Sequence, residues 1–197
     1  MTLDDFKGLI RLTFRAPEQA AHLLMAQGWP MSVRWMALVL TVSVSGLLAW
    51  VSMQFYPAPT GDAAPMFTLG QQPLLLAGLQ LVAVVIGAGL MAGVGRMFGG
   101  HGRFEDALLL AVWIETILLL VQAAQIILSL ALPAFGGLLG ILSVALFLWL
   151  TVQFTKALHG FTSGPKILLV MFATLLALGF VMSFFAAALG LLPEMPQ

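Results

Sequence analysis

The chain has 197 residues, of which 61% are hydrophobic and only 8% are charged. Soluble domains carry about 25% charged residues, so this composition excludes a water-soluble globular protein and indicates a membrane protein. The formal net charge is zero and cysteine is absent, which excludes disulfides and thiolate metal sites. Because the net charge is zero, the chain has no general attraction to nucleic acid, and we expect no nucleic-acid partner. We also expect no metal and no cofactor.

Residues 1–30 form an amphipathic segment rather than a membrane span. Apolar residues recur there at helical spacing, and a basic stripe runs along the same segment at steps of four residues: Lys7, Arg11 and Arg15. A second short helix is predicted from Pro17 to about Ala26. The pattern predicts interfacial helices that contact membrane lipids, including anionic headgroups. A docking surface for a cytoplasmic protein partner is the alternative.

Residues 31–197 contain five apolar runs, each long enough to cross a hydrocarbon core of about 30 Å as a helix. The predicted spans are 33–56, 73–97, 104–132, 135–156 and 166–191. The fold class is therefore an all-α, polytopic integral membrane protein with five transmembrane helices that follow the interfacial segment. Because only Pro133 and Ala134 separate the third and fourth runs, these two spans are expected to form a helical hairpin.

The basic residues predict the orientation of the chain. All eight Lys and Arg residues lie before or at the start of the first span, around the second loop or around the fourth loop. The positive-inside rule then places the N-terminus in the cytoplasm and the C-terminus outside. Trp29 and Trp35 suit the inner interface, and Trp50 and Tyr56 suit the outer one.

Small and polar residues on the second and third spans predict helix contacts. Gly89 and Gly93 are separated by the small-xxx-small spacing, which favours close helix packing within the protein or, alternatively, a homodimer face. The three histidines, His22, His101 and His159, are far apart in sequence and are interpreted as interfacial polar residues rather than metal ligands.

Glu115 is an acidic residue in the middle of an apolar run. It lies about 16 Å along the third run, where an ionised carboxylate costs about 3 kcal/mol. Gln122 and Gln125 share the helical face of Glu115. Gln80 lies on the second run, which enters the membrane from the outside, whereas the third run enters from the cytoplasm. We expect Gln80 to meet Gln122 or Gln125. Candidate partners for Glu115 at similar depth are residues of the first run: Thr41, Ser43 and Ser45.

This intramembrane polar cluster has three interpretations. The first is a hydrogen-bonded clamp between helices. The others are a proton- or ion-handling site and a polar contact to another subunit. The predicted clamp is preferred because no second acid or base lies at matching depth to relay a proton.

The second loop carries a further polar group. Glu105 and Asp106 begin the third span, where carboxylates complement the positive end of the helix dipole. Arg96 and Arg103 flank the glycine turn that precedes them. We therefore expect ion pairs within this loop, with a capping role that requires no catalysis.

Three stretches resemble bacterial members of the Yip-one membrane protein family. They are FEDALLLAVW after the glycine turn, from Phe104 to Trp113, LWLTVQFTKALHGF from Leu148 to Phe161, and LTFRAPEQA from Leu12 to Ala20. The five-span plan with its N-terminus inside is also similar. In eukaryotes that family comprises five-span proteins of the ER and Golgi linked to Ypt/Rab GTPases and vesicle traffic. Because this chain lacks their DLYGP-type motif, the resemblance does not imply Rab binding.

The resemblance implies a non-enzymatic scaffold, adaptor or membrane-organising protein with no catalytic residues. A small channel or transporter subunit is the alternative, with a polar path at Glu115, Gln122 and Gln125. An enzyme is disfavoured because no pairing of nucleophile and base, and no metal-binding motif, is visible in the sequence. A protein partner or a homo-oligomer is compatible with the scaffold role.

Overall fold

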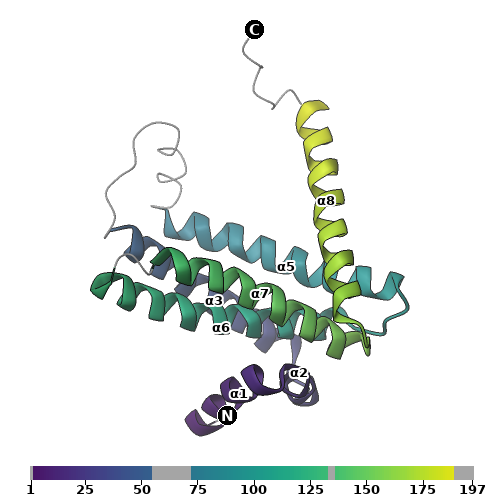
Figure 1. Cartoon of the computed structure of the whole chain (residues 1–197), viewed down its shortest axis with the longest axis horizontal. Coiled ribbons are helices and arrows are strands. Elements are labelled where there is room, and N and C mark those ends of the chain that lie inside the picture. Colours follow the sequence, from purple (N-terminus) through teal and green to yellow (C-terminus); the bar gives the residue numbers. More distant parts are fainter. Residues whose placement is uncertain (1, 55–71, 133–135, 189–197) are drawn as a thin grey trace. The chain divides into compact units, whose positions relative to one another are not determined.

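The structure is a computed structural model that describes residues 2–54, 72–132 and 136–188. These residues form seven α-helices and confirm the all-α prediction (Figure 1). The helices are α1 (Leu3–Arg15), α2 (Pro17–Ala26), α3 (Met31–Met53), α5 (Pro73–Met97), α6 (Phe104–Ala131), α7 (Gly136–His159) and α8 (Gly164–Ala188).

Five of these helices are long and apolar enough to cross a membrane, which confirms the five predicted spans. Their candidate membrane segments are Met31–Met53, Pro73–Met97, Phe104–Ser129, Leu138–His159 and Gly164–Phe185. The fourth helix continues to His159, beyond the predicted end at Lys156. Tyr56, the predicted 133–134 hairpin connection and the predicted end of the last span at residue 191 lie outside the described residues.

The chain divides into two compact units, Met1–Phe161 and Thr162–Gln197. The second unit contains α8, a continuous apolar helix that begins at Gly164 and includes Pro165 in its first turn. Proline is tolerated there because the first backbone N–H groups of a helix have no partner within the helix.

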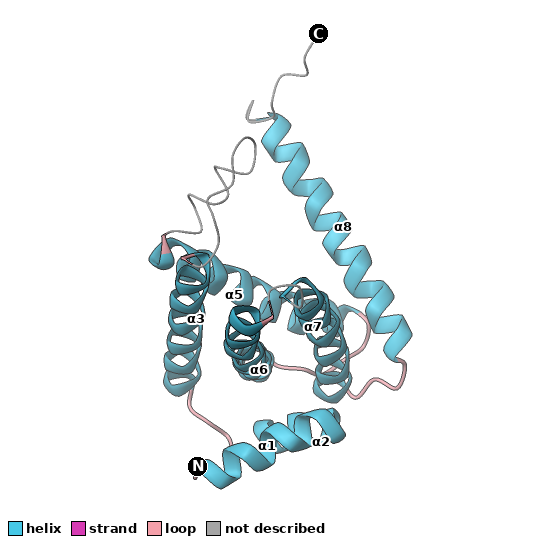
Figure 2. Ribbon diagram, turned by 60° about the vertical axis from the view of Figure 1, so that its left-hand side comes forward, coloured by secondary structure: helices cyan, strands magenta, loops and turns pink. Residues whose placement is uncertain are grey.

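In the first unit, α6 is the central helix. It packs against α3, α5 and α7, while α2 packs on α7 and α6, and α1 packs on α2 (Figure 2). The first half of α6 is buried almost all round, including Leu108, Leu110 and Ile117, whereas its second half from Leu118 onward is only partly buried. Protein rather than lipid therefore surrounds the beginning of this helix.

Close approach between helices occurs at Gly46 rather than at the glycines that the sequence favoured. A Cβ added to Gly46 of α3 would lie 2.8 Å from the carbonyl oxygen of Pro73 in α5. A Cβ at Gly89 or Gly93 would meet no heavy atom within 4 Å among the described residues. Within the first unit, the described residues therefore make no close helix contact at Gly89 or Gly93, and the alternative homodimer face stays a prediction.

Candidate functional site

Two interhelical hydrogen-bonded pairs lie inside the bundle and join α3, α5 and α6. Gln80 Nε2 donates to Glu115 Oε2 at 2.8 Å, which links α5 to α6. Ser45 Oγ donates to Gln122 Oε1 at 3.0 Å, and Gln122 Nε2 donates back to the Ser45 carbonyl oxygen at 3.3 Å, which links α3 to α6. We call these four residues the polar seam: Ser45, Gln80, Glu115 and Gln122.

The polar seam has different pairings from those expected. Gln80 reaches Glu115 instead of Gln122 or Gln125, and Ser45 pairs with Gln122 instead of Glu115. The main-chain carbonyl of Gln125 accepts a hydrogen bond from Ser129 Oγ of the same helix. Interhelical hydrogen bonds in bilayers contribute about 0.6–1.7 kcal/mol each, so the seam stabilises the association of three helices.

A second polar region lies at the end of the bundle where α3 and α6 begin and α5 and α7 end, which we call the basic end. Arg34 Nη1 forms an ion pair with Asp106 Oδ1 at 3.0 Å, and Arg34 Nε donates to the Trp29 carbonyl oxygen at 2.8 Å. The Arg34 side chain is only 7% exposed. It therefore fixes the start of α3 to the start of α6.

The ion pairs predicted within the second loop are only partly present. Arg103 forms the expected pair with Glu105, with both nitrogen–oxygen distances at 3.2 Å. Asp106 pairs instead with Arg34 of the first span, a residue whose position across the bundle the sequence does not reveal. Arg96 Nε donates to the carbonyl oxygen of Ala92 one turn earlier in α5, at 3.3 Å.

The N-terminal helices are attached to the bundle by a set of contacts that we call the N-terminal latch. The indole Nε1 of Trp113 donates to Thr13 Oγ1 at 2.9 Å, and the Thr13 hydroxyl donates to the Leu9 carbonyl oxygen. Phe6 packs edge-on against Trp113 with ring centroids 5.6 Å apart. Lys156 at the end of α7 pairs with Glu18 of α2.

The basic stripe stays on the outside of this arrangement. Lys7, Arg11 and Arg15 are all exposed, whereas Leu9 and Thr13 of the same helix are buried. Sequence reasoning missed the latch. Its available signal was Trp113, because a buried indole N–H needs an acceptor.

His159, which the sequence analysis interprets as an interfacial polar residue, is a buried residue at the end of α7. Its Nδ1 accepts a hydrogen bond from the Gly102 N–H at 3.0 Å, so the ring proton is on Nε2, which donates to the Met91 carbonyl oxygen at 2.9 Å. A Cβ on any of three surrounding glycines would lie within 2.6 Å of the ring: Gly95, Gly100 and Gly102. We call these three residues the glycine cage.

The glycine cage explains the glycine-rich turn between α5 and α6. Only residues without side chains allow the backbone to wrap around the imidazole, and Gly99 in the same turn has a φ of +87°. The ring of His159 also stacks on Phe161, with centroids 5.3 Å apart. The turn is thereby fixed to the end of α7.

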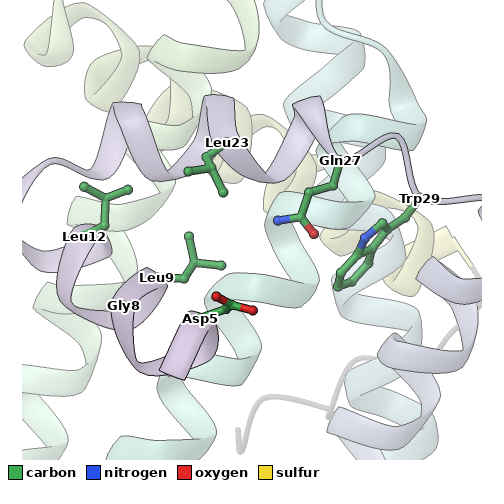
Figure 3. Close-up of a pocket in the computed structure, with 7 residues that line it drawn as sticks. All are labelled: Asp5, Gly8, Leu9, Leu12, Leu23, Gln27 and Trp29. Atoms are coloured by element: carbon green, nitrogen blue, oxygen red, sulfur yellow. The ribbon is translucent and has the colours of Figure 1, made fainter. Parts of the chain in front are cut away.

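A pocket of about 430 Å³ lies between α1, α2 and the residues that follow α2 (Figure 3). Figure 3 shows an apolar end near three leucines and a polar end toward which three side chains point: Asp5, Gln27 and Trp29. Within the three described ranges, no group of three or more His, Asp or Glu side chains is arranged to hold a metal ion.

Fold and site together define a membrane protein with five candidate spans, in which the polar seam and the Arg34–Asp106 ion pair join one helix to another. The chain belongs to the Yip1 domain family, whose match covers residues 11–185. Members of this family are generally non-enzymatic proteins of membrane trafficking. No significant match to the chain is found among curated proteins or solved structures.

Proposed function

We propose that this protein is a non-enzymatic scaffold or adaptor of the bacterial inner membrane, with its N-terminus in the cytoplasm and its C-terminus outside. The observation that carries the proposal is the N-terminal latch. It holds α1 and α2 against α6 and α7 while Lys7, Arg11 and Arg15 stay exposed. The two helices therefore form a fixed platform with an exposed basic stripe rather than a freely moving tail.

The charge distribution supports a platform at the inner membrane surface. Cytoplasmic leaflets are anionic, and each basic residue close to the surface contributes about 1 kcal/mol of attraction. The stripe on α1 and the exposed Arg96 and Arg103 at the basic end have the same sign. We expect this surface to hold anionic headgroups and to present the platform to a partner protein.

Co-purification from a gentle detergent tests the scaffold role. Wild-type protein is compared with a variant that reverses the stripe, Lys7→Glu, Arg11→Glu and Arg15→Glu, at equal amounts of inserted protein. We expect a reproducible set of partner proteins with the wild type and at least tenfold less of them with the variant. Purification of the wild type alone, without a partner or lipid, would contradict the proposal.

The polar seam supports a clamp rather than a transport path. Glu115 and Gln122 are each hydrogen-bonded to a side chain of a neighbouring helix, so the seam ties these helices together. The two functions are distinguished by measuring ion or proton flux through the reconstituted wild-type protein and through the reconstituted Glu115→Gln variant. We expect equal flux, or none, in both proteins. Flux that the substitution abolishes in a folded protein would favour a channel or transporter subunit.

A further inference from the structure

The pocket between α1 and α2 combines an apolar interior with a charged opening. Leu9 is buried at its floor, Leu12 is half-buried, and Leu23 of α2 is 49% exposed. Asp5 and Gln27 are exposed at its other end, where the Trp29 ring also points (Figure 3). A volume of about 430 Å³ falls within the range of small-molecule sites in proteins. The pocket therefore suits an amphiphile rather than a wholly apolar or wholly polar molecule.

The polar end suits a positively charged group that carries N–H donors. Asp5 Oδ2 accepts the Thr2 backbone N–H at 2.7 Å, and this bond keeps the pKa of the Asp5 carboxyl below its usual value. The carboxyl group is therefore an anion at neutral pH and retains lone pairs for a further donor. The Gln27 amide oxygen is a second acceptor, and the Trp29 ring face favours a nearby cation.

The neighbouring face of α1 suits a phosphate. Arg11 follows the pocket-lining residue Gly8 by three positions, and Arg15 follows the pocket-lining residue Leu12 by three positions. Residues three apart on a helix are surface neighbours. Both arginines are exposed and lie outside the pocket lining, so we expect their guanidinium groups to bind a phosphodiester at its rim.

We propose that this pocket binds a phosphatidylethanolamine molecule. Its ammonium group binds Asp5 and Gln27 beside Trp29, its phosphate binds Arg11 or Arg15, and part of an acyl chain lies against the leucines. The choice of headgroup follows from donor chemistry, because a primary ammonium offers three N–H donors and the trimethylammonium of phosphatidylcholine offers none. The proposal goes beyond the scaffold role and does not depend on it.

Native mass spectrometry of the full chain in detergent tests the proposal. The probes are phosphatidylethanolamine, phosphatidylcholine and phosphatidylglycerol with identical acyl chains. The first two lipids have the same net charge, so a difference between them reports the amine. We expect phosphatidylethanolamine to be retained about tenfold more than phosphatidylcholine, the ratio that corresponds to one charge-assisted hydrogen bond.

Two variants locate the bound lipid. Asp5→Asn removes the anion, and we expect it to abolish the preference for phosphatidylethanolamine. Asp4→Asn removes the same charge from the same helical turn outside the pocket lining and is the matched control, for which we expect no change. Gly8→Leu adds an apolar side chain to the pocket lining, and its Cβ would meet no heavy atom within 4 Å. We expect this variant to stay folded and to lose the lipid.

Each other outcome overturns the proposal. Equal retention of phosphatidylethanolamine and phosphatidylcholine would show that the amine is not recognised. Stronger retention of phosphatidylglycerol would show that the basic stripe alone attracts lipid. Unchanged retention by a folded Gly8→Leu protein would place the lipid elsewhere, and retention of a peptide in place of lipid would identify a different class of ligand.

Discussion

Glu115 and Gln80 are hydrogen-bonded to each other from two different candidate membrane helices. The 2.8 Å bond between them joins α5 to α6, and the Ser45–Gln122 pair joins α3 to the same helix. A polar group that is bonded in this way avoids the penalty of an unsatisfied group in hydrocarbon. The two pairs therefore favour one choice of helix faces at the α5–α6 and α3–α6 contacts. Apolar packing alone would select these faces less specifically.

A double-mutant cycle measures the coupling in this pair. Gln80→Leu, Glu115→Leu and the double variant are unfolded in parallel with the wild type in a mixed detergent titration. We expect a coupling free energy of about 0.6–1.7 kcal/mol, because either single substitution removes the same interhelical bond. A coupling energy indistinguishable from zero would show that the two side chains do not act together.

The glycine cage predicts opposite effects for two alanine substitutions on the same helix. Gly95→Ala places a Cβ 2.2 Å from His159 Nε2, so we expect a loss of about 1–3 kcal/mol of stability through displacement of the imidazole. Gly89→Ala meets nothing within 4 Å and should stabilise α5 by up to about 1 kcal/mol. Thermal unfolding in detergent checks both variants, and equal destabilisation by the two would contradict the cage.

The sequence predicts residue roles better than residue partners. The depth of Glu115 in an apolar run predicts that it needs a hydrogen-bond partner, and the absence of a second acid or base at that depth favours the clamp interpretation. The choice of Gln80 as its partner depends on how α5 is rotated about its axis and shifted along it relative to α6. Helical periodicity in the sequence predicts neither of these two quantities. Likewise, His159 and Gly102 are 57 positions apart. Nothing local to either residue indicates their contact.

At the scale of elements, the main finding is that α1 and α2 belong to the same unit as the bundle. Amphipathicity correctly places an apolar and a basic face on α1. The apolar face, however, packs partly on protein, since Leu9 and Thr13 are buried and Trp113 of α6 bonds to Thr13. A hydrophobic stripe has the same pattern whether lipid or protein covers it, so sequence alone does not distinguish the two.

Limited trypsin digestion tests the N-terminal latch, because trypsin cleaves after the exposed Lys7, Arg11 and Arg15. Thr13→Val with Glu18→Gln removes the acceptor of the Trp113 N–H and the anion paired with Lys156. A loss of about 2 kcal/mol in helix docking should raise cleavage by about 30-fold when opening is fast. The exposed neighbour Gln19→Ala is the control. Equal cleavage of the latch variant and the control would contradict docking.

At the scale of the whole molecule, the five-span plan and the basic residues together predict the orientation. The absence of native cysteine makes single-cysteine labelling direct. We expect Gln54→Cys, at the end of α3, to react with an impermeant maleimide in intact cells. Phe98→Cys at the basic end is expected to react only after permeabilisation. The reverse pattern would show that the N-terminus lies outside.

The claim that this protein works by docking a partner on its N-terminal platform is tested most directly by site-specific photo-crosslinking in living cells. A photoreactive residue replaces the exposed Arg11 in one strain and Leu176 of α8, which is 75% exposed, in another. We predict a discrete protein adduct at position 11 that position 176 does not give. Identical adducts at both positions, or only lipid adducts at position 11, would contradict the scaffold role.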